Sequence, residues 1–209
     1  MNTLSAVPVT ELARPSAWLE TYCVEKVSLN NPQTRDINIS DIAVSLANSA
    51  RYIGHTHSQY IYSQAAHSIW VAKYLYKATG NSKLALNGLM ADAFKAYVGD
   101  IAKPVRFMLP VLDQELRALE ERIQLTIMDA FGLPLMTPDT VRWIANAKGM
   151  AMKIEALNLM RSKGEDWPLP ELDEYARAIG FIKPINRWMT EKSFVQYFAL
   201  LNADQGITV

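Results

Sequence analysis

The chain has 209 residues, half of them hydrophobic, which predicts one domain (residues 1–209) around a single core. Its 21 basic and 21 acidic residues cancel, which excludes nonspecific nucleic-acid binding, and its single cysteine, Cys23, excludes an internal disulfide and a cysteine-rich zinc site. Its apolar runs stop short of the ~20 residues of a membrane span and its start lacks a signal-peptide layout, so we expect a cytoplasmic protein without membrane contact.

The first forty residues predict the only β-structure. Residues 23–29 and 35–39 are rich in β-branched side chains, and they flank a turn-like Asn30-Asn31-Pro32. This pattern indicates a short hairpin ahead of the first helix.

The remainder predicts an all-α bundle, because apolar residues recur at three- and four-residue intervals and most of these runs end at a glycine. Asp41 is the expected N-cap of the first helix. Helices are expected over 41–53, 60–79, 82–98, 113–131, 139–163 and 187–203. Residues 164–184, rich in proline, glycine and charge, are expected to wrap the surface before the last helix docks.

The residue types that bear chemistry gather in the first half of the chain. All three histidines, His55, His57 and His67, fall within thirteen residues. If the helices over 60–79 and 82–98 pack as an antiparallel pair, His67 approaches Asp92. Two ligands are too few for a hydrolytic metal site, which normally holds its ion with three or more protein groups.

The order and spacing of four segments, 40–48, 51–55, 62–72 and 91–101, resemble the HD-domain nucleotide phosphohydrolases. The branch that the chain resembles contains the bacterial 5'-deoxynucleotidases and related phage and prophage enzymes. The resemblance covers about 20–162, and 163–209 is left as the surface wrap and docking helix.

This resemblance implies a helical bundle whose metal is held by a His, a His-Asp pair and a later Asp, and which removes phosphate from nucleotides by metal-activated water. By position, His67 matches the first His and Asp92 the Asp of the pair, while Ala91 replaces the paired His and Lys148 the later Asp. One unit charge against another at ~4 Å is worth ~4 kcal/mol at an effective dielectric of ~20, so Lys148 opposes a divalent ion. We therefore expect no cofactor and an ammonium of Lys148 that pairs with Asp92.

The resemblance also implies a phosphate-binding set. Arg51 and Tyr52 match positions that contact phosphate and sugar, and Lys95 and Lys148 add positive charge. His55 is assigned either to this set or to hydrogen bonds that hold its loop.

Further positive charge at the same cleft is expected from Lys103 and Arg106. Asp100 either caps a turn or lines the site.

These features predict a protein that binds a nucleotide, another phosphate-bearing small molecule or a protein partner without efficient turnover. The alternative is an active phosphohydrolase of deoxynucleotides that uses Asp92 and Asp100 with Mn, Co, Mg or Zn. A structural or inhibitory protein is a third reading. A homodimer is left open, and a viral origin would place the protein in the host cytoplasm.

Overall fold

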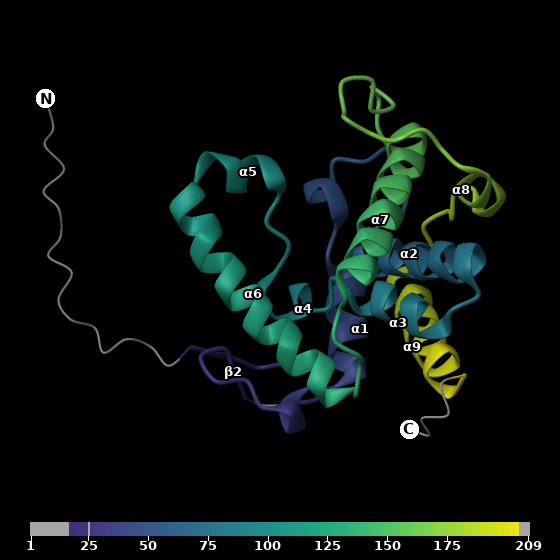
Figure 1. The fold of residues 1–209 in the computed structure, drawn as a ribbon. Coiled ribbons are helices and arrows are strands. Elements are labelled where there is room, and N and C mark those ends of the chain that lie inside the picture. Colours follow the sequence, from purple (N-terminus) through teal and green to yellow (C-terminus); the bar gives the residue numbers. More distant parts are fainter. Residues whose placement is uncertain (1–16, 25, 205–209) are drawn as a thin grey trace, which may run out of the picture.

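The computed structural model describes residues 17–24 and 26–204, which form an all-α fold with one small β-hairpin (Figure 1). The predicted fold class is confirmed. Strand β1 (Trp18–Leu19) pairs in antiparallel fashion with β2 (Val27–Ser28). The expected second strand, residues 35–39, is wrong, since Thr34–Asp36 forms the 3-10 helix η1. The pairing partner of β2 comes from upstream in the sequence, because the stretch after β2 forms η1 and then α1.

The cap of the first helix also differs from the prediction. Helix α1 (Ile39–Asn48) begins after Asn38, whose side chain accepts a backbone N–H of the first turn. Asp41 is buried and instead accepts hydrogen bonds from the backbone N–H of Cys23, at 2.6 Å, and from the Thr21 hydroxyl, at 2.8 Å. Its carboxylate therefore holds the hairpin against α1.

Helix α1 stops five residues before the predicted end at residue 53. The chain then makes a short left-handed turn, η2 (Arg51–Gly54), in which Tyr52 and Ile53 have φ values of 55° and 54° and Gly54 has 80°. A left-handed conformation is unfavourable for a β-branched residue such as isoleucine. The turn therefore carries backbone strain next to Arg51.

Two further helices follow, α2 (Gln64–Thr79) and α3 (Ser82–Met90), with Gly80 in the left-handed conformation between them. Helix α2 begins four residues after the predicted start at 60, because Ser63 caps its first turn. The predicted continuation of the second helix to residue 98 is interrupted by a turn at 91–94, after which α4 (Lys95–Val98) forms. Gln124 explains the interruption, because its side chain donates to the carbonyl of Met90 and accepts from the N–H of Phe94. A side chain from another helix thus replaces the broken helical hydrogen bonds.

The second half of the chain contains one long helix pair and shorter elements. Helix α5 was not predicted; it has Pro104 in its first turn, where the missing N–H costs nothing. The bounds are α5 (Lys103–Met108), α6 (Pro110–Ala130), α7 (Pro138–Leu159), α8 (Glu174–Ile179) and α9 (Arg187–Ala203). Helix α7 ends four residues before the predicted end at 163, because Met160 adopts extended dihedral angles. Helix α8 lies within the expected surface wrap.

The core is built around α2, which contacts α1, α3, α7, α8 and α9 (Figure 1). Trp70 and Leu75 of α2 are fully buried, and Phe194 of α9 is buried with them, which confirms the expected docking of the last helix. Within residues 17–24 and 26–204, no helix has the length and apolar character needed to cross a membrane.

Candidate functional site

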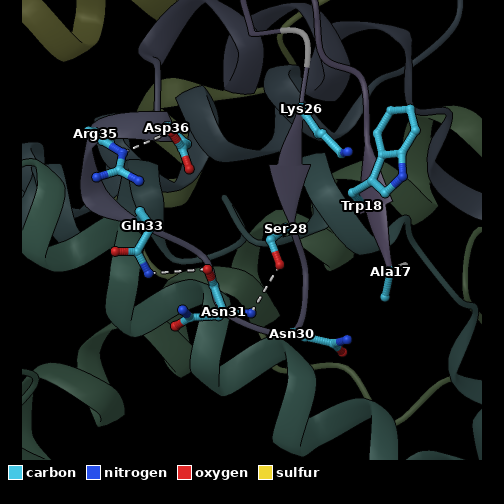
Figure 2. A pocket seen from close by; sticks show the side chains of 9 residues that line it. All are labelled: Ala17, Trp18, Lys26, Ser28, Asn30, Asn31, Gln33, Arg35 and Asp36. Carbon is cyan, nitrogen blue, oxygen red and sulfur yellow. Dashed lines mark hydrogen bonds and ion pairs between the residues drawn. The ribbon is translucent and has the colours of Figure 1, made fainter. Parts of the chain in front are cut away.

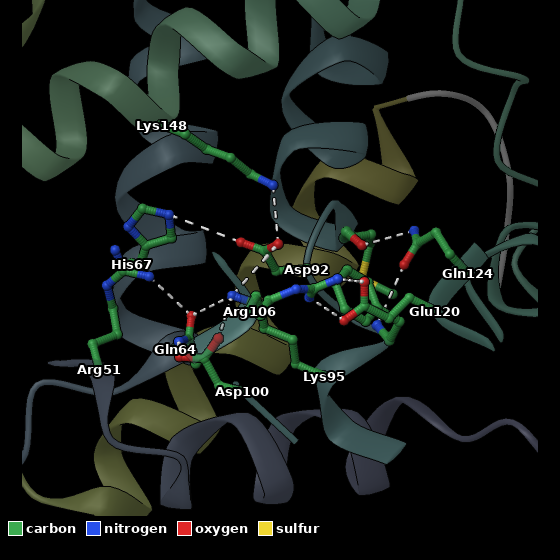
Figure 3. Close-up of polar contacts among 12 residues, drawn as sticks. Arg51, Gln64, His67, Asp92, Lys95, Asp100, Arg106, Glu120, Gln124 and Lys148 are labelled. Carbon is green, nitrogen blue, oxygen red and sulfur yellow. Dashed lines mark hydrogen bonds and ion pairs between the residues drawn. The ribbon is translucent and has the colours of Figure 1, made fainter. Parts of the chain in front are cut away.

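Polar side chains from η2, α2, α4, α7 and the loops around α4 converge inside the bundle (Figure 3). Hydrogen bonds and ion pairs connect seven of them in a circuit that closes where His67 approaches Asp92, and the eighth, Lys148, is attached to the circuit through Asp92. We call this set the polar ring. Its members are Arg51, Gln64, His67, Asp92, Lys95, Asp100, Lys148 and Glu155.

Glu155 on α7 is fully buried, as is Gln64. Its carboxylate accepts from the Arg51 Nε at 3.0 Å, from the Tyr52 hydroxyl, and from the His67 Nδ1 at 2.6 Å. Burial alone would raise the pKa of Glu155, but the Arg51 guanidinium and these hydrogen bonds lower the pKa to about 2. Glu155 is therefore ionised at neutral pH.

The contact with Glu155 fixes the tautomer of His67. A carboxylate only accepts, so Nδ1 of His67 carries the proton. Burial, and then the nearby Arg51 charge, lower the pKa of His67, which keeps its imidazole neutral. Its Nε2 is then unprotonated and faces Oδ2 of Asp92 at 4.0 Å, as the antiparallel packing of the helices over 60–79 and 82–98 predicted.

Asp92 lies between two ammonium groups. The Lys148 Nζ donates to Asp92 Oδ1 at 3.0 Å, and the Lys95 Nζ lies 3.8 Å from the same oxygen. Burial alone would raise the pKa of Asp92, but Lys148 and then Lys95 hold it well below its usual range. The ion pair predicted between Lys148 and Asp92 is thus present.

Gln64 joins the two halves of the ring. Its amide oxygen accepts from Arg51 Nη1 at 3.1 Å and from Lys95 Nζ at 3.5 Å, and its amide nitrogen donates to Asp100. Lys95 also pairs with Asp100 at 2.8 Å. Asp100 therefore belongs to the polar ring through contacts with Gln64 and Lys95, and its role in a binding site stays a prediction.

The donors available in the ring do not fit a divalent metal ion. His67 Nε2 and the Asp92 carboxylate are the two groups that the resemblance assigned as ligands, and the Lys148 ammonium, 3.0 Å from Asp92 Oδ1, places a positive charge beside them that repels a divalent cation. Among the residues the structure describes, no group of three or more His, Cys, Asp or Glu side chains has the arrangement of a metal site.

Three side chains of the ring are the most exposed to solvent. Arg51, Gln64, His67, Asp92 and Glu155 are buried. The side chains of Lys148, Asp100 and Lys95 are 30%, 22% and 16% exposed, so the accessible mouth of the ring contains two ammonium groups and one carboxylate. Three positive and three negative side chains cancel across the whole ring, and the excess of positive charge lies at this mouth.

His55, Tyr52 and Arg106 lie apart from this mouth. His55 is exposed and lines an open hollow with His57 and Arg161, whose Nε donates to His57 Nε2 at 2.9 Å. Tyr52 contacts the buried side of the polar ring, where its hydroxyl donates to Glu155 and the Arg51 guanidinium lies 5.2 Å from the centre of its aromatic ring. The prediction that Arg106 adds positive charge to this cleft is wrong, because its guanidinium is paired with Asp113 and Glu120.

Two ring residues were not predicted from the sequence. Glu155 lies seven residues after Lys148, which places both on one face of α7, and its apolar neighbours Ile154 and Ala156 are a signal that its carboxylate is buried. Gln64 lies three residues before His67 on α2, but glutamine is too common on helices to be singled out by spacing.

A second polar hollow lies at the β-hairpin and contains none of the ring residues (Figure 2). Its wall includes Trp18, with Lys26 Nζ 4.9 Å from the centre of the indole, and the polar turn after β2. Its volume is about 450 Å³.

Comparison with known proteins places the chain among relatives from two bacteria. YfdR of Escherichia coli K12, described as an uncharacterized protein, is 32% identical over 155 residues, which span 74% of this chain and 79% of YfdR. RCAP_rcc00048 of Rhodobacter capsulatus, also described as uncharacterized, is 31% identical over 143 residues, which span 67% of this chain and 71% of that protein. No protein-family model matches the chain. The identity and coverage show that this chain belongs to the same family as YfdR and RCAP_rcc00048.

Proposed function

We propose that this protein is a divergent HD-domain-like protein that binds a phosphate-bearing small molecule, preferentially a nucleotide, at the mouth of the polar ring and does not hydrolyse it efficiently. The observation that carries the proposal is the ion pair between Lys148 and Asp92. The Lys148 ammonium of this pair supplies positive charge where the resemblance to phosphohydrolases implies a metal, and a phosphate can contact this ammonium directly.

The geometry at the mouth supports binding of an anion. Lys148 and Lys95 both lie within 4 Å of Asp92 Oδ1, and both side chains are partly exposed. A phosphate that approaches them can accept hydrogen bonds from both ammonium groups while each keeps its contact with a carboxylate. The buried Arg51 and Glu155 behind the mouth hold His67 and Gln64 in position.

The first test measures binding without metal. In a buffer with EDTA, we expect nucleoside monophosphates to raise the melting temperature, and nucleosides without phosphate to have little effect. Lys148→Gln, which keeps a hydrogen-bond donor near Asp92 but removes the charge, should abolish the response. Lys153→Gln, on the same helix but outside the ring, is the matched control.

The second test locates the ligand and measures turnover. Because the chain has three histidines, their imidazole signals in NMR separate the ring, which contains His67, from the outer hollow, which contains His55 and His57. We expect a nucleotide to shift the signal of His67 and leave the others in place. Stoichiometric Mn, Co, Mg or Zn together with phosphate release that Asp92→Asn abolishes would overturn the proposal in favour of an active nucleotidase.

A further inference from the structure

The hairpin formed by α5 and the first half of α6, which we call the arm, exposes apolar side chains to solvent and buries charged ones. Phe107, Met108 and Val111 are 75%, 79% and 78% exposed, although they are among the largest apolar residues of the arm. Val105, Leu109 and Leu112 extend this surface, each more than 40% exposed. We call these six residues the arm face.

Charged residues of the same arm are turned inward. The Arg106 guanidinium forms two hydrogen bonds with the Glu120 carboxylate, at 2.6 and 3.0 Å, and also pairs with Asp113. The side chains of all three are at most 16% exposed. Figure 3 shows Arg106 joined to Glu120. This ion-pair network fixes α5 on α6.

The arm face lies apart from the core. The contacts of α6 with the body are with η1 and α4, through the half of α6 that contains the buried Ile123 and Ile127. Figure 1 shows α5 and the first half of α6 standing away from the other helices. The arm face is therefore not covered by any described residue of this chain.

The size of the arm face suits pairing with an identical surface. Taking about 150–200 Å² for a fully exposed large side chain, the exposed fractions correspond to roughly 600 Å² of apolar surface, the upper end of what monomers show. Two such faces would bury about 1,200 Å² in total, which reaches the range of stable protein interfaces.

Exposed charges of opposite sign lie on α5 and on the first half of α6. Lys103 at the start of α5 and Glu115 on α6 are both exposed, and they lie six residues before and six residues after Leu109 at the apex. The two-fold arrangement that we test below places α5 of one copy on α6 of the other and pairs each Lys103 with a Glu115. The chain has no net charge, so two copies do not repel one another.

We infer that the arm face is the contact between two copies of this chain, which form a symmetric dimer through α5 and the first half of α6. This contact is independent of the nucleotide site proposed above.

The test is a concentration series in analytical ultracentrifugation. We expect the unmodified protein to change from monomer to dimer, and Phe107→Asp with Val111→Asp to raise the dissociation constant at least ~100-fold. Both positions are exposed, so far-UV circular dichroism should be unchanged. Leu135→Asp, equally exposed but beyond the far end of α6, about 30 Å away, is the control and should dimerise normally.

A charge exchange tests the two-fold geometry without changing the apolar residues. Lys103→Glu alone and Glu115→Lys alone should each weaken the dimer, and the two together should restore it. A protein that stays monomeric at every concentration, or a dimer insensitive to the arm variants, would overturn the inference. Binding of the monomer to anionic lipid vesicles, lost in the same variants, would assign the arm face to a membrane surface instead.

Discussion

Asp92 shows how a single buried carboxylate depends on its cationic neighbours. Its nearest ammonium is Lys148 at 3.0 Å, and Lys95 lies further away at 3.8 Å. A buried charge that loses its partner keeps its desolvation cost without the compensating attraction. Lys148 thus keeps Asp92 ionised inside the bundle, and this role does not depend on which ligand the protein binds.

We expect Lys148→Ala to lower the free energy of unfolding by about 1–3 kcal/mol, because Asp92 is left with the more distant Lys95. Urea denaturation measures the loss. Lys148→Met combined with Asp92→Asn should cost less than the two single changes added together, since the two residues interact. An unchanged urea midpoint for Lys148→Ala would show that the pair contributes nothing to folding.

At the scale of the elements, the closest approach is between α2 and α3. A Cβ built on Gly88 would lie 2.2 Å from Cδ1 of Leu75 and 3.3 Å from Cγ1 of Val71, and both neighbours are fully buried. Gly88→Ala should therefore destabilise the protein by about 1–3 kcal/mol through overpacking.

Gly149→Ala is the matched comparison for this change. Gly149 is also helical, but its added Cβ would lie 3.4 Å from Pro170, an ordinary contact distance. The gain in helix propensity, about 1 kcal/mol, should then leave this variant as stable as the parent or more so. Equal thermal shifts for the two glycine variants would contradict the close packing of α2 on α3.

The left-handed turn η2 gives a second prediction at this scale. Ile53 has a φ of 54° and is 66% exposed, so its side chain contributes little packing to offset the backbone strain. Ile53→Gly should raise the free energy of unfolding by about 0.5–1 kcal/mol, the relief of strain less the added entropy of glycine. Calorimetric unfolding measures the change. The reference variant is Ile61→Gly, because Ile61 is also exposed but has no positive φ, and this variant should lose stability.

For the whole molecule, the polar ring predicts sensitivity to acid. The pKa of Glu155 in the folded protein, about 2, lies below its unfolded value of ~4.3. Ionised Glu155 therefore contributes its full stabilisation above pH ~4.3, and this contribution is lost as the pH falls toward 2. The lowered pKa of Asp92 acts in the same direction, and its stabilising contribution decreases as the pH falls below its unfolded value of ~3.9. His67, kept neutral by burial, favours unfolding as the pH drops below 6.5, because the unfolded imidazole binds a proton more readily.

We therefore expect the free energy of unfolding to decrease steadily from pH 6.5 to pH 2, by up to about 1.4 kcal/mol per pH unit for each proton taken up. Urea titrations across this range measure the slope. Glu155→Gln should be less stable at neutral pH and show a shallower decline between pH 4.5 and pH 2. A parent protein whose stability is constant over this interval would show that the ring carboxylates are not selectively stabilised in the folded state.

The sequence by itself determined the all-α class, most helix cores and the meeting of His67 with Asp92, because helical periodicity is a local property that each segment carries on its own. It also predicted the Lys148–Asp92 pair, through the resemblance that aligned the two positions. The structure alone revealed the hairpin partner of β2, the break at 91–94, the inclusion of Gln64 and Glu155 in the ring and the outward-facing apolar arm. Each of these depends on side chains from elements distant in sequence, such as Gln124 at the break and Arg51 against Glu155, and contacts of that kind leave no periodic signal along the chain.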